Sequence, residues 1–344
     1  MKKIPLFKSI LKKQDYKVVE KSLKTGWLTH GSNNLIFEKK FNKLIGSKYS
    51  ISMNSCTSAL ECSLKIIKKK GEVIIPSWTW VSTANAVINT GNTPVFADVD
   101  INSRNITGKN IKKNITKKTI AVIIVHYAGL PCEMDEILKI TKKNNIELIE
   151  DSAETLGATW RNKYTGSFGT GCFSFFPTKN LGGFGDGGMV TMSSEDIYNR
   201  VKTLRVHGSS IKYYHKVIGG NFRIDALQAG IVLAKLKYLD QWTEMRRGNA
   251  QVYNRLFSER GLTNHITIPP EIVPRHVYNQ YVVRVKKKRN ELRSFLSKNN
   301  ISTEIYYPLP LHLQDCFTFL GYNKGAFPES EKAANETIAL PIFP

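Results

Sequence analysis

Lys179 stands between a hydrophobic segment and a glycine-dense loop, in the stretch SFFPTKNLGGFGDGG that runs from Ser174 to Gly188. Glycines let a backbone pass close to a ligand and adopt positive φ angles, so we expect both from this loop. A lysine that is partly removed from water there can lose its proton and form a Schiff base with a carbonyl compound. The alternative is a surface lysine in a flexible loop, in a chain with 50 lysines and arginines.

Asp151 directly follows an apolar run that ends at Ile149 and Glu150. We expect it at the carboxyl end of a strand, where open α/β sheets bind their ligands. A buried aspartate in that place can hold a proton on a pyridine nitrogen. At ~4 Å and an effective dielectric constant of ~20, such a pair attracts by roughly 4 kcal/mol before desolvation costs. Taken alone, an acid at a strand end is equally consistent with a metal ligand or a helix cap.

Two further segments are informative mainly in combination with these residues. The hydroxyl-rich segment NSCTS at residues 54–58 leads into a helical pattern, and a helix N-terminus binds phosphate through its N–H groups and its dipole. Ordinary capping explains Ser55 or Thr57 equally well. In PSWTW, Trp80 offers a flat aromatic side chain for stacking on a ring, although a core tryptophan is an alternative interpretation.

These residues need a sheet that brings strand ends together. From Gly71 to Ser194, short β-branched runs alternate with helical patterns, which predicts an α/β fold with a largely parallel sheet. The predicted strands cover residues 72–75, 94–97, 120–126, 146–150, 172–175 and 188–192, and the predicted helices cover residues 58–69, 82–89 and 135–144.

A second, smaller domain follows the sheet. After Arg223, apolar residues recur at three- and four-residue spacing for longer than in a usual helix, which predicts a long, bent connecting helix. An extended segment at 280–285, a helix at 290–298 and a Tyr- and Pro-rich stretch at 306–312 come next. We therefore expect a large α/β domain over residues 1–235 and a small α+β domain over residues 236–344.

The net charge of +22 is compatible with nucleic acid, an anionic membrane or an anionic small substrate. The lysines are scattered through many segments and are not concentrated in one arm or recognition helix, so we expect no nucleic-acid partner. Most of them are interpreted as a solvated surface.

Composition and cysteine usage bound the remaining possibilities. A chain of 344 residues that is 41% hydrophobic and 23% charged suits a large globular domain with a smaller one. Its five cysteines form no CxxC pair, so we expect a reducing compartment and no metal site.

The longest apolar run, at 120–128, is about half of the ~20 residues that a membrane crossing needs. Lysines interrupt the N-terminus before a signal-peptide core can form. We expect a soluble, cytoplasmic protein without a membrane partner.

In this chain order the segments resemble the sugar aminotransferases of the DegT/DnrJ/EryC1/StrS family. The resemblance runs from GWLTHGSNNLIFEKKF at Gly26 through NSCTSAL, PSWTWVSTANAV, EDSAETLGA, SFFPTKN and GDGG to NFRIDALQA and YYPLPLH. It implies the aspartate aminotransferase-like fold type I, pyridoxal 5′-phosphate as cofactor, and a homodimer with sites shared between subunits.

The resemblance also implies roles for individual residues. Lys179 becomes the Schiff-base lysine, and Asp151 pairs with the pyridinium nitrogen. The other implied cofactor contacts are Thr57, Ser58 and Ser174 at the phosphate, Trp80 on the ring, Glu154 at the cofactor face or ring hydroxyl, and Asn221 at the phosphate of the neighbouring subunit's cofactor. The expected substrate contacts are Thr29, Arg223, Tyr306, Tyr307 and His312, and packing at the domain junction is an alternative for the last four.

The sequence departs from the family pattern at three places. Many relatives carry Gln or His where this chain has Glu154, so the role of a carboxylate there is open. Cys56 occupies a position that is frequently glycine, and we interpret it as a small buried residue rather than a nucleophile. The chain stops at LPIFP, where relatives usually continue into a closing helix, so we expect either a truncated chain or a small domain that ends unusually.

The resemblance implies transfer of an amino group from L-glutamate to a nucleotide-linked ketosugar, such as a UDP- or dTDP-sugar, in amino-sugar biosynthesis for a surface polysaccharide. The stretch from His207 to Asp225 resembles enzymes that aminate a 3-keto sugar, which implies amination at carbon 3, and amination at carbon 4 is the alternative. A sugar dehydratase of the same fold is disfavoured because such relatives replace the lysine by histidine. A noncatalytic or regulatory binding protein is the remaining alternative.

Overall fold

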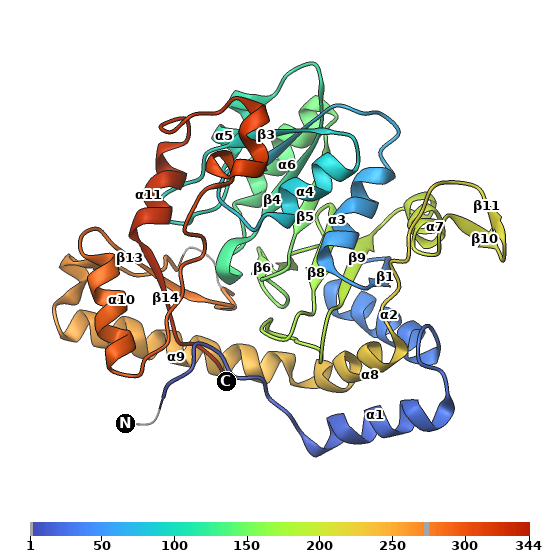
Figure 1. Ribbon diagram of the computed structural model, residues 1–344, viewed down its shortest axis with the longest axis horizontal. Coiled ribbons are helices and arrows are strands. Elements are labelled where there is room, and N and C mark those ends of the chain that lie inside the picture. The colour runs from blue at the N-terminus through green and yellow to red at the C-terminus, as the bar shows by residue number, and fades with distance from the viewer. Residues whose placement is uncertain (1–2, 272–274) are drawn as a thin grey trace.

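A seven-stranded sheet forms the centre of the computed structural model, which describes residues 3–271 and 275–344 (Figure 1). Across the sheet the strand order is β1-β9-β8-β5-β4-β2-β3. Neighbours from β8 to β3 pair in parallel, whereas β9 is antiparallel to both β1 and β8. The predicted α/β fold with a mixed, mostly parallel sheet is confirmed. The strands are β1 (Tyr49–Met53), β2 (Glu72–Pro76), β3 (Thr93–Ala97), β4 (Thr119–Val125), β5 (Glu147–Asp151), β8 (Thr170–Ser174) and β9 (Gly188–Met192).

All six predicted strands of the large sheet are present, with ends shifted by at most a few residues. They were recognisable because strands buried on both faces are nearly continuous hydrophobic runs. The edge strand β1 was missed because its sequence, YSISM, carries two serines. Both serines are buried and hydrogen-bonded to Glu38 of a neighbouring helix, the Ser50 hydroxyl to its backbone carbonyl at 2.9 Å and the Ser52 hydroxyl to its carboxylate at 2.7 Å.

Helices cover both faces of the sheet. Helices α3 and α4 pack on the face that carries Ile75, Ile123 and Ile149, and α5 and α6 pack on the face that carries Ile74 and Val122. Further along the sheet, α2 and α8 enclose a third apolar cluster with the ends of β8 and β9. The helices of this region are α1 (Lys13–Thr25), α2 (Ser32–Ile45), α3 (Cys56–Lys65), α4 (Ser82–Asn89), α5 (Gly108–Asn114), α6 (Met134–Asn144), α7 (Glu195–Leu204) and α8 (Ala226–Lys235).

The predicted long helix is α8 followed by α9 (Leu239–Glu259), with a 3₁₀ turn at Leu236–Tyr238 between them. In Figure 1 the two helices run across the lower part of the molecule, and α1 lies below α8 in this view. The predicted domain boundary after residue 235 falls on this turn and remains a prediction.

The small sheet has the order β12-β13-β14, and β13 is antiparallel to both neighbours. The chain's first described residues join this part, because Ile4 forms a parallel bridge with Ile301. The elements here are β12 (Ile266–Thr267), β13 (Tyr281–Val285), β14 (Thr337–Leu340), α10 (Arg289–Lys298) and α11 (Pro328–Glu336).

Short elements complete the described residues. They are the two-residue strands β6 (Thr159–Trp160) and β7 (Lys163–Tyr164), the hairpin of β10 (Ser209–Ile211) and β11 (Tyr214–His215), and 3₁₀ turns at Tyr127–Gly129, Leu262–Asn264, Leu311–Leu313 and Asp315–Leu320. Within the described ranges, no helix combines the length and the apolar character that crossing a membrane requires.

Candidate active site

The carboxyl ends of the parallel strands gather the residues that the sequence singled out. Asp151 is the last residue of β5 and Ser174 is the last residue of β8. The loop after β8 carries Lys179, and the loop after β2 carries Trp80. Parallel strands that share a direction end at one edge of the sheet, which is the usual ligand site of such folds.

Asp151 is buried and is held by neutral donors. The Thr83 hydroxyl donates to Oδ2 at 3.0 Å, and the Ala153 N–H and the Cys56 thiol donate to Oδ1 at 3.2 and 3.8 Å. Burial raises the pKa of Asp151, and the bonds from Ala153 and Thr83 only partly oppose this effect. Within the described residues no cation lies at ion-pair distance from its carboxylate. A buried carboxyl in this state fits the protonated ring nitrogen of pyridoxal phosphate.

Lys179 lies close to a second acid. Its Nζ is 3.1 Å from Glu154 Oε1, and both side chains are largely buried. Glu154 also accepts the Ala128 N–H on Oε2 and the Gln280 amide on Oε1, each at 2.8 Å. The tertiary structure thus pairs the amine expected to carry the cofactor with the carboxylate at which the sequence departs from its relatives.

Aromatic side chains border this acid–lysine pair. The Tyr307 ring centroid lies 5.9 Å from that of Trp80, and burial together with the nearby Glu154 raises the pKa of Tyr307. Trp80 is exposed, whereas Trp78 is buried and donates its indole N–H to the Tyr307 carbonyl at 2.9 Å. The Tyr127 hydroxyl donates to the Tyr306 carbonyl at 2.6 Å. An exposed indole beside the acids suits the predicted stacking on a cofactor ring.

The N-terminus of α3 has the features of a phosphate site. Ser55 caps the helix by accepting the Ser58 N–H at 3.1 Å, and the Ser58 hydroxyl donates to Asn54 at 2.6 Å. The hydroxyl of Thr57 has no hydrogen-bond partner among the described residues, and the Ser174 hydroxyl accepts only a long 3.3 Å bond from Phe176. Both hydroxyls are half-buried and remain available for a ligand.

The glycines of the loop after Lys179 do not have the backbone conformation that the sequence predicted. Among its glycines, none of Gly182, Gly183, Gly185, Gly187 and Gly188 adopts a positive φ, so that prediction was wrong. Gly188 is needed because the backbone of β9 passes close to the backbone of Ser55 and Cys56. A Cβ on Gly188 would overlap the Ser55 carbonyl and lie 2.7 Å from the Cys56 nitrogen. The glycine therefore lets β9 pass against the start of α3.

The predicted substrate contacts divide into two groups. Tyr306 and Tyr307 belong to the aromatic border of the site, and Arg223 forms a bridge to Met53 next to the start of α3. His312 is not brought to this cluster. Its imidazole is buried, lies 3.0 Å from Glu331 and packs edge-on against Phe327. This enclosed imidazole agrees with the alternative interpretation for His312, packing between elements, and a substrate contact by His312 stays a prediction.

Thr29 and Asn221 lie on exposed segments. Thr29 is in the loop between α1 and α2. The backbone carbonyl of Asn221 accepts the Asn54 amide at 3.0 Å, so this segment lies beside the start of α3 in its own chain. The Asn221 side chain forms no hydrogen bond within the described residues and is exposed.

Three contributors to the site had no distinct signal in the sequence. Thr83 is an ordinary hydroxyl in the first turn of α4, and Ala128 acts through its backbone N–H. Gln280 comes from the segment before β13, more than 120 residues from Glu154 in the chain. Only the hydroxyl of Thr83, one turn after the PSWTW segment, could have been suspected.

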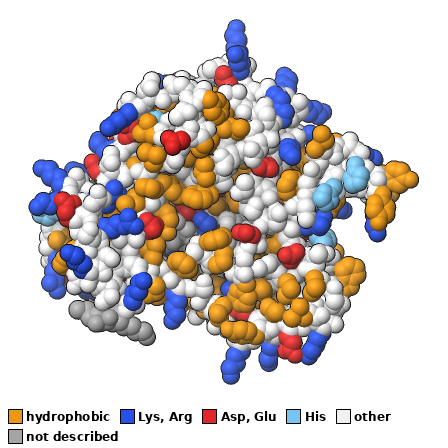
Figure 2. All heavy atoms as spheres, viewed as in Figure 1, with side chains coloured by type: hydrophobic (Ala, Val, Ile, Leu, Met, Phe, Trp, Pro, Cys, Tyr) orange, Lys and Arg blue, Asp and Glu red, His pale blue; other side chains and the backbone are white. Residues whose placement is uncertain are grey.

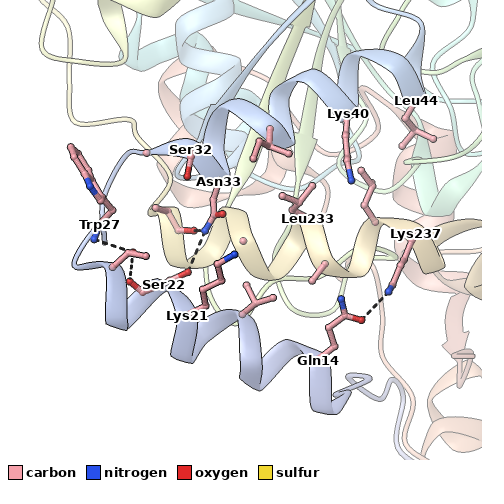
Figure 3. Close-up of a pocket in the computed structure, with 18 of the residues that line it drawn as sticks. Gln14, Lys21, Ser22, Trp27, Ser32, Asn33, Lys40, Leu44, Leu233 and Lys237 are labelled. Carbon is pink, nitrogen blue, oxygen red and sulfur yellow. Dashed lines mark hydrogen bonds between the residues drawn. The ribbon is translucent and has the colours of Figure 1, made fainter.

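A separate hollow lies elsewhere and is lined by none of these residues. Helices α1, α2 and α8 enclose about 1050 Å³, with Lys21, Lys40 and Leu233 among the side chains that line it (Figure 3). Trp27 stands at one end of this hollow. Its position between helices, away from the strand ends, separates it from the acid–lysine site.

Comparison with known proteins agrees with the geometry. A pleiotropic regulatory protein of Geobacillus stearothermophilus is 41% identical over 302 residues, covering 87% of this chain and 81% of the relative. The dTDP-3-amino-3,6-dideoxy-alpha-D-galactopyranose transaminase of Aneurinibacillus thermoaerophilus is 36% identical over 341 residues, covering 96% and 91%. The crystal structure of DesV from S. venezuelae in complex with a ketimine intermediate superposes with a TM-score of 0.95 at 30% identity, covering 100% of this chain and 94% of that one.

The DegT/DnrJ/EryC1/StrS aminotransferase family matches the chain over residues 9–344, and the crystal structure of a relative at 26% identity, NtdA from Bacillus subtilis, contains the bound cofactor PMP. The family, the fold type and the cofactor predicted from the sequence are confirmed. The chain belongs to the DegT/DnrJ/EryC1/StrS aminotransferase family, whose members are pyridoxal 5′-phosphate-dependent enzymes of fold type I.

Proposed function

We propose that this enzyme moves the amino group of L-glutamate to the keto group of a nucleotide-linked sugar, in the biosynthesis of an amino sugar for a surface polysaccharide. The observation that carries the proposal is the pairing of Lys179 with Glu154 next to the buried Asp151. A lysine, a buried acid for a ring nitrogen and a helix N-terminus for a phosphate are the parts that amino transfer with this cofactor needs.

When bound, pyridoxal 5′-phosphate supplies an electron sink for charge at the donor's amino carbon. Asp151 keeps the ring nitrogen protonated, and the start of α3 with Thr57 and Ser174 receives the phosphate. Lys179 Nζ takes the proton from the Cα of the amino acid as a general base. Glu154 Oε1, at 3.1 Å, holds the resulting ammonium group in place.

The sugar nucleotide is proposed to bind at the open side of this site. Its diphosphate is anionic and suits a chain of net charge +22, with Arg223 as the proposed contact near the start of α3. Tyr306 and Tyr307 are proposed to face the sugar hydroxyls. The similarity to a dTDP-3-amino sugar transaminase supports amination at carbon 3 and a dTDP- or UDP-linked substrate.

We also propose that the chain acts as a homodimer. Large apolar side chains are exposed beside the two segments that carry Thr29 and Asn221, namely Trp27, Leu28, Tyr213 and Ile218. Figure 2 shows the hairpin of β10 and β11 as an apolar projection from the body of the molecule. Exposed apolar groups of this kind mark contact surfaces.

All five cysteines are free thiols, which supports our placing the enzyme in the cytoplasm.

The test compares wild type with Lys179→Ala, each loaded with cofactor. We expect the wild-type visible absorption band to shift into the near-ultraviolet when L-glutamate is added, because the cofactor takes up the amino group. The variant should show neither this loss of the visible band nor transamination. The physical reason is that no other amine replaces Lys179 as the base. The matched control is Asp186→Asn, at an exposed position of the same loop, which should leave the shift intact.

Three results would contradict the proposal. Full turnover by Lys179→Ala would remove the lysine from the chemistry. A wild-type spectrum that does not respond to any amino acid would favour a noncatalytic binding protein. Release of a deoxygenated sugar without net amino transfer would identify a dehydratase.

A further inference from the structure

A buried polar pair, His126 and Glu150, lies directly behind the active site and has no part in the chemistry described above. Both side chains are fully buried. Glu150 precedes Asp151 in β5, and successive residues of a strand point to opposite faces of the sheet. Asp151 therefore serves the cofactor face, whereas Glu150 serves the face covered by α6.

The Glu150 carboxylate is saturated with donors. It accepts the backbone N–H groups of Gly166, Phe168 and Gly169 at 2.8, 2.7 and 2.8 Å. His126 Nε2 is its fourth partner, at 3.1 Å. Burying a carboxylate is costly unless such bonds compensate, so this acid is fixed in one orientation.

The second imidazole nitrogen defines the tautomer of His126. Nδ1 accepts the Cys132 N–H at 2.9 Å, so it carries no hydrogen. The hydrogen therefore lies on Nε2 and is donated to Glu150. One neutral imidazole thus links the fixed acid to the far end of the turn that follows β4.

This turn delivers a backbone group to the active site. The His126 N–H donates to the Asp151 carbonyl at 3.2 Å, which ties the start of the turn to β5. Two residues later, the Ala128 N–H donates to Glu154 Oε2 at 2.8 Å. Ala128 has a φ of 57°, a conformation that a non-glycine residue keeps only when its surroundings impose it. The imidazole bond to Cys132 closes the turn around this residue.

We propose that His126, oriented by Glu150, is a positioning residue for Glu154. It holds the turn at residues 126–132 so that the Ala128 N–H fixes one oxygen of Glu154 and leaves the other aimed at Lys179. The inference rests on the proposed function, in which Lys179 and Glu154 work together.

Two substitutions separate the two bonds of the imidazole. In His126→Gln, the side-chain amide can still donate to Glu150, but the Cys132 N–H loses its acceptor. In His126→Asn, the shorter amide can still accept from Cys132, which makes it the conservative rescue. We expect kcat to fall by about 10- to 100-fold in His126→Gln and by much less in His126→Asn. The KM for L-glutamate should stay nearly unchanged, because misplacing Glu154 affects the reaction step and not the binding of the amino acid.

The first readout needs no turnover. Amide hydrogen exchange of the cofactor-free protein should become at least about tenfold faster at residues 127–132 in His126→Gln, while residues 137–144 of α6 keep their protection. Ile137→Val, a buried change in the helix α6 that covers the same face of the sheet, is the matched control and should leave the exchange of the turn unchanged.

The second readout is a double-mutant cycle with Glu154→Ala. If His126 acts through Glu154, adding His126→Gln to Glu154→Ala changes kcat by less than about twofold, since coupled residues are not additive. Additive losses would overturn the proposal, as would unchanged exchange at the turn or an equal rise of exchange throughout the sheet. Because exchange is measured without catalysis, this result is independent of whether Lys179→Ala refutes the proposed function.

Discussion

At the scale of single residues, the two buried acids of the site differ in the partners that compensate their charge. Asp151 is buried among neutral donors, whereas Glu154 has a lysine at 3.1 Å. The two acids are three residues apart, yet their surroundings differ because only one of them faces Lys179. Without the cofactor, the Asp151 carboxylate is a destabilising charge, and a cationic ring nitrogen is the partner that relieves it.

Asp151→Asn should therefore stabilise the cofactor-free protein near neutral pH. Because the folded-state pKa of Asp151 is raised, the protonated carboxyl is favoured in the folded chain, and this contribution is lost as the pH rises through that pKa. Each unit by which a pKa is raised corresponds to about 1.4 kcal/mol. We expect the variant to melt above wild type near neutral pH, and this advantage to disappear in mild acid.

With cofactor present the order should reverse. Wild type gains more stability from pyridoxal 5′-phosphate than the variant, and the variant loses most of its activity because a neutral partner no longer keeps the ring nitrogen protonated. Thermal melts at two pH values, with and without cofactor, make the test. Identical melting of both proteins without cofactor at every pH would show that the carboxylate is not a buried charge.

At the scale of elements, the phosphate site depends on the contact of β9 with the first turn of α3. Ser55 caps that helix, and Gly188 lets the strand approach the cap. The antiparallel strand β9 sits between β1 and β8, so it lies directly under the segment that joins β1 to α3. The strand order of the sheet thus sets the position of the phosphate site.

Gly188→Ala should destabilise the protein by about 1–3 kcal/mol, since the new methyl group overlaps the Ser55 backbone. The same overlap displaces the start of α3, so we expect weaker binding of the cofactor in an equilibrium titration. The matched control is Gly248→Ala in α9, where the added methyl meets no atom within 4 Å. That change should stabilise the protein by about 1 kcal/mol because alanine favours helix. Unaltered cofactor affinity in Gly188→Ala would contradict this account of the phosphate site.

At the scale of the whole molecule, the proposed dimer decides which chain completes each site. The Asn221 side chain is exposed, but its backbone lies beside Asn54 of its own chain. We predict that the Asn221 side chain contacts the cofactor phosphate of the partner subunit. The alternative is a contact with the phosphate in its own chain, and the hydrogen bond to Asn54 is the observation that favours this alternative.

Mixing two inactive variants distinguishes these arrangements. In a mixed dimer of Lys179→Ala and Asn221→Asp, shared sites place both lesions in one site and leave the other intact, so each mixed dimer should recover about half of the wild-type activity. Each parent alone should stay inactive. A mixture that exchanges subunits, as verified by tagged chains, and still shows no activity would mean that each chain builds its site alone.

The sequence by itself determined the sheet and the identity of the chemical groups. Strands such as β4 are continuous apolar runs, and the stretches around Lys179 and Asp151 are local in the chain, so both could be predicted from their residues. The strand β1 could not, because its serines are buried only through Glu38 of α2.

Only the tertiary structure decided how the groups are paired. Glu154 receives Ala128, Lys179 and Gln280 from three different parts of the chain, and His312 turns to Glu331 instead of to the site. The glycines after Lys179 serve close packing and not positive φ, since what surrounds them comes from α3 and its cap. The physical reason is range: strand patterns and motifs are read within a few residues, whereas hydrogen bonds and burial in the site join residues separated by up to 126 positions.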